Sequence, residues 1–416
     1  MYRTYNSRPI PGRAPARRTG WPFLAALFIV LGAYVLFTLV RPLAPLQVTV
    51  TPPVMPGLVR VKIPWPAAAP NQQAALGADG YGLLASKGPE TPIPMASVTK
   101  TITALSVLQK KPLKPGEQGP GITMTAADVV TYNEYVAKDG TVVPVYPGQT
   151  VTQYQALQAL MLPSANNIAD KLAVWAFGSM EAYLEYANAL VKSLDMKQTT
   201  VSDASGFNPK TVSTATDLVR LGDAALDNPV LAEIVSQPTA EYPEAGTIRN
   251  VNKLLGQSGI RGIKTGNTEE AGGCLLAAAD VPLTGSGGKT IRVITAVMAS
   301  PDPAQAMRGT LPMIQSAPSQ FQTVKAVRDG QNLGKVTSEW GESVAIEAAD
   351  DMSVTTWTGT AITPHASKVS VKAPAKAGEA IGTISLKLNG KEQKTDIVLA
   401  AAIERPSLWW RLTHPF

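Results

Sequence analysis

The stretch IPMASVTKTITALSVLQ, residues 93–109, determines the fold that we expect for this sequence. Beyond Pro94 its apolar residues recur on one side of a helix, so the spacing predicts a helix with Ser97 in its first turn. Ser97 and Lys100 are three residues apart and therefore share a face of that helix. A serine hydroxyl is a weak nucleophile that needs an adjacent base, and a lysine whose pKa is lowered by its surroundings can be that base. The stretch therefore predicts a nucleophile beside its base.

The same spacing occurs a second time, in Ser286-Gly287-Gly288-Lys289. That copy lies in a glycine-rich stretch between two predicted strands, where the two side chains need not meet. We interpret it as a solvated turn. The S-x-x-K pattern alone is therefore weak evidence, and the interpretation of Ser97 depends on other motifs.

A second motif, Ser164-Ala165-Asn166, precedes a helical run. A serine in such a loop is often an ordinary N-cap, which is a structural role. In the functional interpretation, the hydroxyl of Ser164 relays a proton and the amide of Asn166 holds the backbone of a substrate. Both interpretations are open when the motif is considered alone.

A third motif, Lys264-Thr265-Gly266, lies on a predicted strand and is followed by Asn267. A lysine on an edge strand can simply prevent unwanted pairing. In the functional interpretation, the strand edge binds an extended peptide by adding it to the sheet, with Lys264 and Thr265 facing a substrate carboxylate. Gly266 would then let the substrate approach closely.

The patterns around these motifs divide the chain into two predicted domains. Residues 74–318 mix helical and strand-like periods, which predicts a layered α/β (α+β) domain. From 319 to 405 the pattern changes to short strands separated by Gly, Asp and Pro, which predicts a small all-β domain.

Residues 21–40, WPFLAALFIVLGAYVLFTLV, are twenty residues without a charge. As a helix they would span about 30 Å, the thickness of a bilayer core. The five arginines of residues 1–20, with no acid among them, predict a cytoplasmic basic tail and place the later residues outside the cell membrane. A cleaved signal peptide has a shorter apolar core and a small-residue cleavage site, so we favour an uncleaved signal anchor in the lipid bilayer over that alternative.

Two further segments flank the predicted domains. Residues 41–73 contain eight prolines and predict an extended stalk, in which the V-T-V and V-R-V-K-I segments are candidates for short strands. Residues 406–416 form an aromatic tail with Trp409 and Trp410 beside Arg411. Such a tail suits either contact with the membrane interface or packing back on the β domain.

Composition excludes several classes of protein. The net charge is +6, but without residues 1–20 the chain has 32 basic and 31 acidic residues, so we expect no nucleic-acid partner. His365 and His414 both fall outside the predicted α/β domain, which argues against a Ser-His-Asp hydrolase. The single cysteine, Cys274, lies in the apolar run GGCLLAAA and is interpreted as a small hydrophobe. We therefore expect no metal, no cofactor and no cysteine-dependent L,D-transpeptidase.

The order and spacing of the three motifs resemble the signature of penicillin-binding proteins and serine β-lactamases. The resemblance is to the low-molecular-mass D-alanyl-D-alanine carboxypeptidases, the S11 peptidase family, and covers roughly residues 74–405. It rests on the motifs and on three further segments: SDASGFNPKTVSTATDLVRLGDAAL, IRGIKTGNTEEAGGCLLAAA and AKAGEAIGTISLKLNGKEQKTDIVLAAAI. The last resembles the family's C-terminal β-sandwich, and a plain β-lactamase would lack it. The resemblance implies a β-lactamase/transpeptidase-like fold for the α/β domain.

The resemblance also implies a reaction. Lys100 takes the proton of Ser97, which attacks the carbonyl between two D-alanines of a peptidoglycan stem peptide, and Ser164 helps to protonate the leaving amine. The backbone N–H groups of Ser97 and Asn267 form the oxyanion hole. Water then hydrolyses the acyl-enzyme, and β-lactams acylate the same serine.

The resemblance assigns the terminal carboxylate of the substrate to two side chains. They are Thr265 and Arg249, the latter 15 residues before Lys264, which adds positive charge. The chain departs from the family pattern at Asn267, where histidine is common, and in having its anchor at the N-terminus. A serine β-lactamase and a non-catalytic cell-wall-binding scaffold on the same fold are the alternatives.

Overall fold

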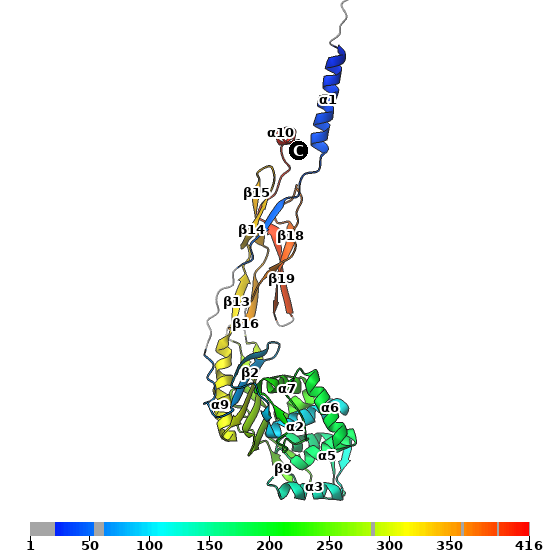
Figure 1. The fold of residues 1–416 in the computed structure, drawn as a ribbon, viewed down its shortest axis with the longest axis vertical. Helices are drawn as coiled ribbons and strands as arrows, with labels where there is room; N and C mark the ends of the chain where they lie inside the picture. Colours follow the sequence, from blue (N-terminus) through cyan, green and yellow to red (C-terminus); the bar gives the residue numbers. More distant parts are fainter. Residues whose placement is uncertain (1–20, 54–61, 284–287, 359–361, 389–390, 416) are drawn as a thin grey trace, which may run out of the picture.

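The computed structural model describes residues 21–415 apart from 54–61, 284–287, 359–361 and 389–390 (Figure 1). The predicted basic tail, residues 1–20, and Ser286 of the second S-x-x-K copy lie outside the described residues. Helix α1 (Trp21–Val40) lies at one end of the long molecule and a mixed α/β domain at the other, with a β domain between them.

The α/β domain is built on an antiparallel sheet with strand order β10-β11-β12-β2-β3. Strand β11 (Gly272–Pro282) is an almost continuous apolar run because it is buried on both faces. Strand β10 (Ile260–Thr268), which carries the third motif, forms one edge of the sheet. The other strands are β12 (Thr290–Ser300), β2 (Gln73–Ala78) and β3 (Gly82–Lys87).

Helices cover both faces of this sheet and create two apolar cores. Helix α9 (Pro303–Ser316) packs on one face, where Met313 and Ile314 contact strand residues such as Leu275. Helices α7 (Ala215–Asp227) and α8 (Pro229–Val235) contact the other face. Alternate residues of each strand therefore belong to different cores, as the pleat of a strand requires.

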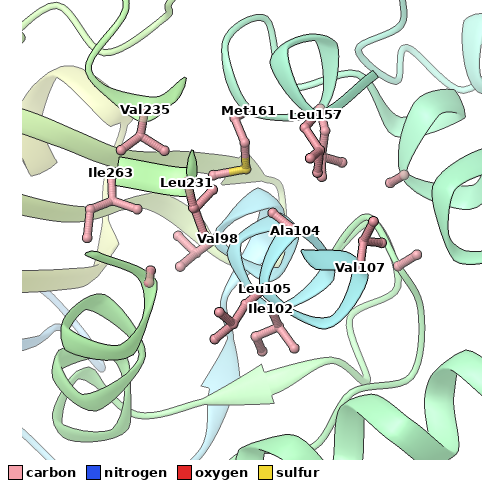
Figure 2. Packing of buried hydrophobic residues seen from close by; sticks show 14 of the residues in the cluster. Val98, Ile102, Ala104, Leu105, Val107, Leu157, Met161, Leu231, Val235 and Ile263 are labelled. Atoms are coloured by element: carbon pink, nitrogen blue, oxygen red, sulfur yellow. The ribbon is translucent and has the colours of Figure 1, made fainter. Parts of the chain in front are cut away.

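Helix α2 (Thr99–Lys110) lies at the centre of the helical part and is buried from Thr99 to Leu108. Figure 2 shows Ile102 and Leu105 projecting from α2, with Leu157 and Met161 on a neighbouring helix. Ser97 was predicted in the first turn of this α-helix. It lies instead in a 3-10 turn, η1 (Ala96–Val98), just before the α-helix begins. Because α2 is packed on all sides, it holds the residues at its start in a fixed position.

The remaining elements of this domain surround α2 and the edge strand β10. The helices are α3 (Ala126–Val136), α4 (Gln153–Met161), α5 (Asn166–Phe177) and α6 (Met180–Ser193), with a 3-10 turn η2 (Gln257–Gly259). The short strands are β4 (Ile93–Pro94), β5 (Gly121–Thr123), β6 (Thr150–Thr152), β7 (Val212–Ser213), β8 (Thr239–Tyr242) and β9 (Gly246–Arg249).

The β domain follows a 3-10 turn, η3 (Ala317–Gln320), and packs two sheets around one apolar core. One sheet pairs β13 (Phe321–Val327) with β16 (Met352–Trp357). The other has the order β1-β14-β15-β19-β18-β17. Its strands include β14 (Asn332–Thr337), β15 (Ser343–Ala348), β17 (His365–Ala366), β18 (Ala380–Leu388) and β19 (Lys391–Leu399).

Strand β1 (Gln47–Val50) comes from the segment that we expected to be a stalk. It pairs antiparallel with β14, from Gln47 opposite Thr337 to Val50 opposite Gly334. The V-T-V segment is thus an edge strand of the β domain, so part of residues 41–73 is folded into a domain. Most of V-R-V-K-I lies outside the described residues.

The C-terminal tail forms a short helix, α10 (Leu408–Thr413), beside the end of α1. Arg411 donates to the carbonyl of Leu39 at 2.8 Å, and the hydroxyl of Tyr34 donates to the carbonyl of Leu412 at 2.6 Å. Trp410 packs edge-to-face on Trp340 of the β domain, with ring centroids 6.1 Å apart. The tail thus packs on the β domain through Trp410 and on the end of α1 through Arg411 and Leu412, while its contact with a membrane interface stays a prediction.

Candidate active site

Lys100 is completely buried, and its ammonium nitrogen meets three oxygen atoms. Nζ lies 2.8 Å from Ser97 Oγ, 2.7 Å from Asn166 Oδ1 and 2.8 Å from the carbonyl oxygen of Ser205. The last two oxygens can only accept hydrogen bonds. A neutral amine has two N–H groups for these acceptors, so its lone pair is left for the hydroxyl of Ser97. In the charged form the same nitrogen donates to all three oxygens, so only the neutral form presents a lone pair to Ser97.

The pKa of Lys100 matches this orientation. Burial lowers it from 10.5 to about 7, because the charged form loses its hydration, while the nearby carboxylates of Asp203 and Asp170 act in the opposite direction. The neutral amine is therefore far more accessible near neutral pH than that of an ordinary lysine. A base with a pKa near the working pH is the most effective kind.

Ser97 is positioned by its neighbours in the turn η1. Ala96, just before it, has a left-handed backbone with φ of +47°. Gly266 of β10 lies against this turn, because a Cβ added to it would be 3.0 Å from the carbonyl oxygen of Met95 and 3.2 Å from the nitrogen of Ser97. A side chain at position 266 would therefore press on the turn that carries Ser97, which gives a local reason for the glycine of the third motif.

Ser164 lies in the loop between α4 and α5 and is strained. Its φ is +74°, an unfavourable region for a residue with a side chain. Its hydroxyl is buried and has no hydrogen-bond partner within the described part of the chain. Strain and an unpaired polar group are both features that structures tolerate mainly at functional sites. Asn166 begins α5 two residues later and reaches Lys100.

Lys264 of the third motif is also buried, only 1% exposed, and its Nζ lies 3.2 Å from the carbonyl oxygen of Thr265. Burial lowers its pKa well below the usual value, and the charge of Lys100 lowers the pKa further. The two lysines are thus close enough to influence each other. Thr265 is half-buried and Asn267 exposed, both on the edge strand β10.

Arg249 lies at the end of β9 and is exposed. Its guanidinium makes no hydrogen bond or ion pair with the residues that the structure describes. Two residues further on, the backbone N–H of Val251 donates to the carbonyl of Leu162, just before the Ser164 loop. Among the described residues, Ser97, Lys100 and Asn166 are therefore in direct contact, whereas the role of Arg249 stays a prediction.

Two residues near Lys100, Ser205 and Asp170, were not among those predicted. The carbonyl of Ser205 is a backbone group and has no signature in the sequence. Asp170 follows Asn166 by four residues on α5, and its spacing could have placed it on the same helix face. Its carboxylate accepts from the hydroxyl of Tyr135 at 2.9 Å, and burial raises its pKa to about 6.

Both domains of the chain match families of known proteins. The sequence profile of the S11 peptidases, described as D-alanyl-D-alanine carboxypeptidase, matches residues 74–302. The profile of the C-terminal domain of penicillin-binding protein 5 matches residues 321–405.

Individual relatives cover much of the chain. It is 25% identical over 310 residues to the D-alanyl-D-alanine carboxypeptidase DacF of Bacillus subtilis, covering 71% of this chain and 76% of the relative. It is 31% identical over 208 residues to DacB2 of Mycobacterium tuberculosis, covering 48% of this chain and 67% of that one. Penicillin-binding protein 5 from Haemophilus influenzae has a similar fold, with a TM-score of 0.57 and 20% identity over 84% of this chain and all of that chain.

The predicted fold class is confirmed by these comparisons, including the transpeptidase-like α/β domain, the β domain and one N-terminal apolar helix. The S11 profile matches more than half of the 416 residues. This chain therefore belongs to the D-alanyl-D-alanine carboxypeptidase family, peptidase family S11.

Proposed function

We propose that this protein is a serine-type carboxypeptidase that removes the terminal D-alanine from peptidoglycan stem pentapeptides through an acyl-enzyme on Ser97. One observation carries the proposal. The two carbonyl acceptors around Lys100 Nζ leave its lone pair for the hydroxyl of Ser97.

In the acylation step, Lys100 accepts the proton of Ser97 as Oγ bonds to the carbonyl carbon of the penultimate D-alanine. Backbone N–H groups of Ser97 and Asn267 stabilise the oxyanion. The C–N bond then breaks, and the proton passes to the leaving amine with the help of Ser164. The buried, unpaired hydroxyl of Ser164 supports this assignment, because it has a hydrogen bond still to make.

In the second step, water attacks the acyl carbonyl and Ser97 Oγ leaves. Lys100 takes a proton from the water, and Ser97 recovers its proton, so the enzyme returns to its starting state. Asn267 stands here where the family commonly has histidine. Because the oxyanion donor at this position is a backbone group, we expect acylation to tolerate the difference and deacylation to respond to it.

Substrate binding is assigned to the open edge of β10. An extended peptide can pair there with the backbone around Thr265 and Gly266. Its terminal carboxylate would meet Thr265, Lys264 and Arg249, while the amide of Asn166 would hold its backbone. An entering carboxylate favours the charged form of a lysine, so binding would raise the lowered pKa of Lys264. β-Lactams, which present a strained amide, would acylate Ser97 in the same position.

The anchor is assigned to α1, retained in the mature protein with the catalytic domain outside the cell membrane. Helix α1 is long and apolar enough to cross a bilayer, and nearly all of its side chains are exposed. Contacts from Arg411 and Tyr34 join its end to α10, and these would be lost if the helix were cleaved off. Protease added outside intact cells should remove the catalytic domain, and full protection would overturn this orientation.

The test of the activity uses the full-length protein in detergent with a pentapeptide that ends in D-Ala-D-Ala. We expect release of one D-alanine by the wild type and none by Ser97→Ala. Hydrolysis retained in Ser97→Ala would refute the nucleophile, and binding without hydrolysis by the wild type would favour a scaffold. Rapid turnover of a bound penicillin would favour a β-lactamase.

A further inference from the structure

The loop from Asp203 to Phe207 contacts Lys100, the proposed base, and the turn that carries Ser97, the proposed nucleophile. Its Ser205 carbonyl is one of the two acceptors that orient Lys100. Thr103 of α2 donates to the carbonyl of Ala204 at 2.7 Å, which fixes the loop to the same helix that carries Lys100. The position of this loop therefore affects the position of the Lys100 amine.

Gly206 brings this loop into close contact with the turn η1. Its φ is +77°, and a Cβ added to it would be 1.8 Å from the carbonyl oxygen of Ala96. The loop thus touches both the residue before Ser97 and the amine of Lys100. A small change in its conformation would alter both positions at once.

One carboxylate organises the loop. Oδ2 of Asp203 accepts from the hydroxyl of Ser205 at 2.7 Å and from the backbone N–H of Phe207 at 2.9 Å, with longer bonds from the N–H groups of Ser205 and Asn208. Oδ1 accepts from the hydroxyl of Thr211 at 2.6 Å. Hydrogen bonds to an ionised acceptor are the strong kind, and five of them from one short segment leave it little freedom.

We propose that Asp203 is a positioning residue for the base, which holds the Ser205 carbonyl so that the lone pair of Lys100 points at Ser97. The inference rests on the proposed function of Ser97 and Lys100. Asp203 does not touch the reacting atoms; it acts through the loop.

The charge of Asp203 gives a second, separable effect. Three charged groups face Lys100: Asp203 from the loop, Asp170 from α5 and Lys264 from β10. The negative charge of Asp203 favours the protonated amine and so opposes the effect of burial. Without this charge, the neutral amine would form at lower pH. Geometry should thus set the highest acylation rate, and charge should set the pH at which half of it is reached.

Two variants separate these effects. Asp203→Asn keeps one oxygen for the donors on the Oδ2 side, and the Thr211 hydroxyl can turn to accept from the new amide. We expect its maximum rate of acylation to stay within about threefold of the wild type, with the midpoint of the pH profile at lower pH. Asp203→Ala frees the loop, and we expect a loss of about 100-fold, the scale of a 1 Å misplacement of a catalytic group.

The experiment measures acylation of the full-length protein by a fluorescent penicillin from pH 5 to 9, with thermal unfolding of each variant as the folding control. Asp280→Asn, in an exposed ion pair with Arg261 in the same domain, is the matched control and should leave the profile unchanged. Wild-type rates in Asp203→Ala would overturn the proposal, as would equal losses in both Asp203 variants without a shift in the pH profile. A wild type that penicillin does not acylate would overturn the proposed function itself. If Asp203→Ala fails to fold, Asp203→Glu replaces it, because it keeps the charge but displaces the carboxylate; a wild-type maximum rate in that variant would overturn the proposal.

Discussion

Replacing Gly206 by alanine should damage both the stability of the α/β domain and the reactivity of Ser97. The new Cβ would sit 1.8 Å from the carbonyl oxygen of Ala96, and backbone atoms cannot easily move away. The left-handed φ of +77° adds strain for any residue with a side chain. We take about 1–2 kcal/mol for the backbone conformation and about 1–3 kcal/mol for the forced displacement. The free energy of unfolding should therefore fall by about 2–5 kcal/mol.

Gly178→Ala is the matched control for this substitution. Gly178 follows α5 in the same domain with φ of +90°, and a Cβ there would meet nothing within 4 Å. Gly178→Ala therefore introduces the backbone strain but no steric clash. The difference between the two variants isolates the contact with the turn η1.

The assay combines urea unfolding of the full-length protein, followed by tryptophan fluorescence, with acylation by a fluorescent penicillin. Gly178→Ala should lose about 1–2 kcal/mol and keep its rate of acylation. Gly206→Ala should be less stable than that control and should react more slowly even where it is fully folded, because the turn that holds Ser97 has moved. Equal stability of the two variants, with equal rates, would refute the reasoning.

Three further predictions concern the base, the position after the third motif and the anchor. The rate of acylation by penicillin should rise with pH through a midpoint near 7, because Lys100 must lose its proton before it can accept one from Ser97; a profile flat between pH 5 and 9 would contradict this. Asn267→His should alter the lifetime of the acyl-enzyme while the acylation rate, followed in the same experiment, stays within about threefold, since the donor there is a backbone group. Arg411→Ala should speed amide hydrogen exchange at Leu39 and Leu412, because the junction between α1 and α10 loosens, while the protein stays bound to membranes. Unchanged exchange would show that the hydrogen bond from Arg411 to the carbonyl of Leu39 does not stabilise this junction.

The sequence predicted those parts of the site that depend on local spacing. Ser97 and Lys100 meet because residues three apart share a helix face, even though Ser97 lies in a 3-10 turn just before the α-helix. The third motif was expected to lie on a strand, and that strand is the edge strand β10. The roles of the individual side chains stay predictions.

Other features depend on contacts between distant segments or on backbone groups. The carbonyl of Ser205 reaches Lys100 across 105 residues of chain, and no residue type marks a carbonyl group. Ala96, which has a left-handed backbone, lies against Gly266 of β10 and against Gly206, two segments far from it in the sequence. The V-T-V segment was a candidate strand, but its partner could not be identified from the sequence, because the pairing of β1 with β14 joins segments nearly 300 residues apart.

The measurement that tests the central claim most directly is mass spectrometry of the full-length protein after incubation with penicillin. The account predicts one adduct per chain, mapped by fragmentation to the peptide that contains Ser97. Ser97→Ala should carry no adduct, while its thermal unfolding stays close to that of the wild type. An adduct on any other residue, or an unmodified wild type, would contradict the assignment of Ser97 as the nucleophile.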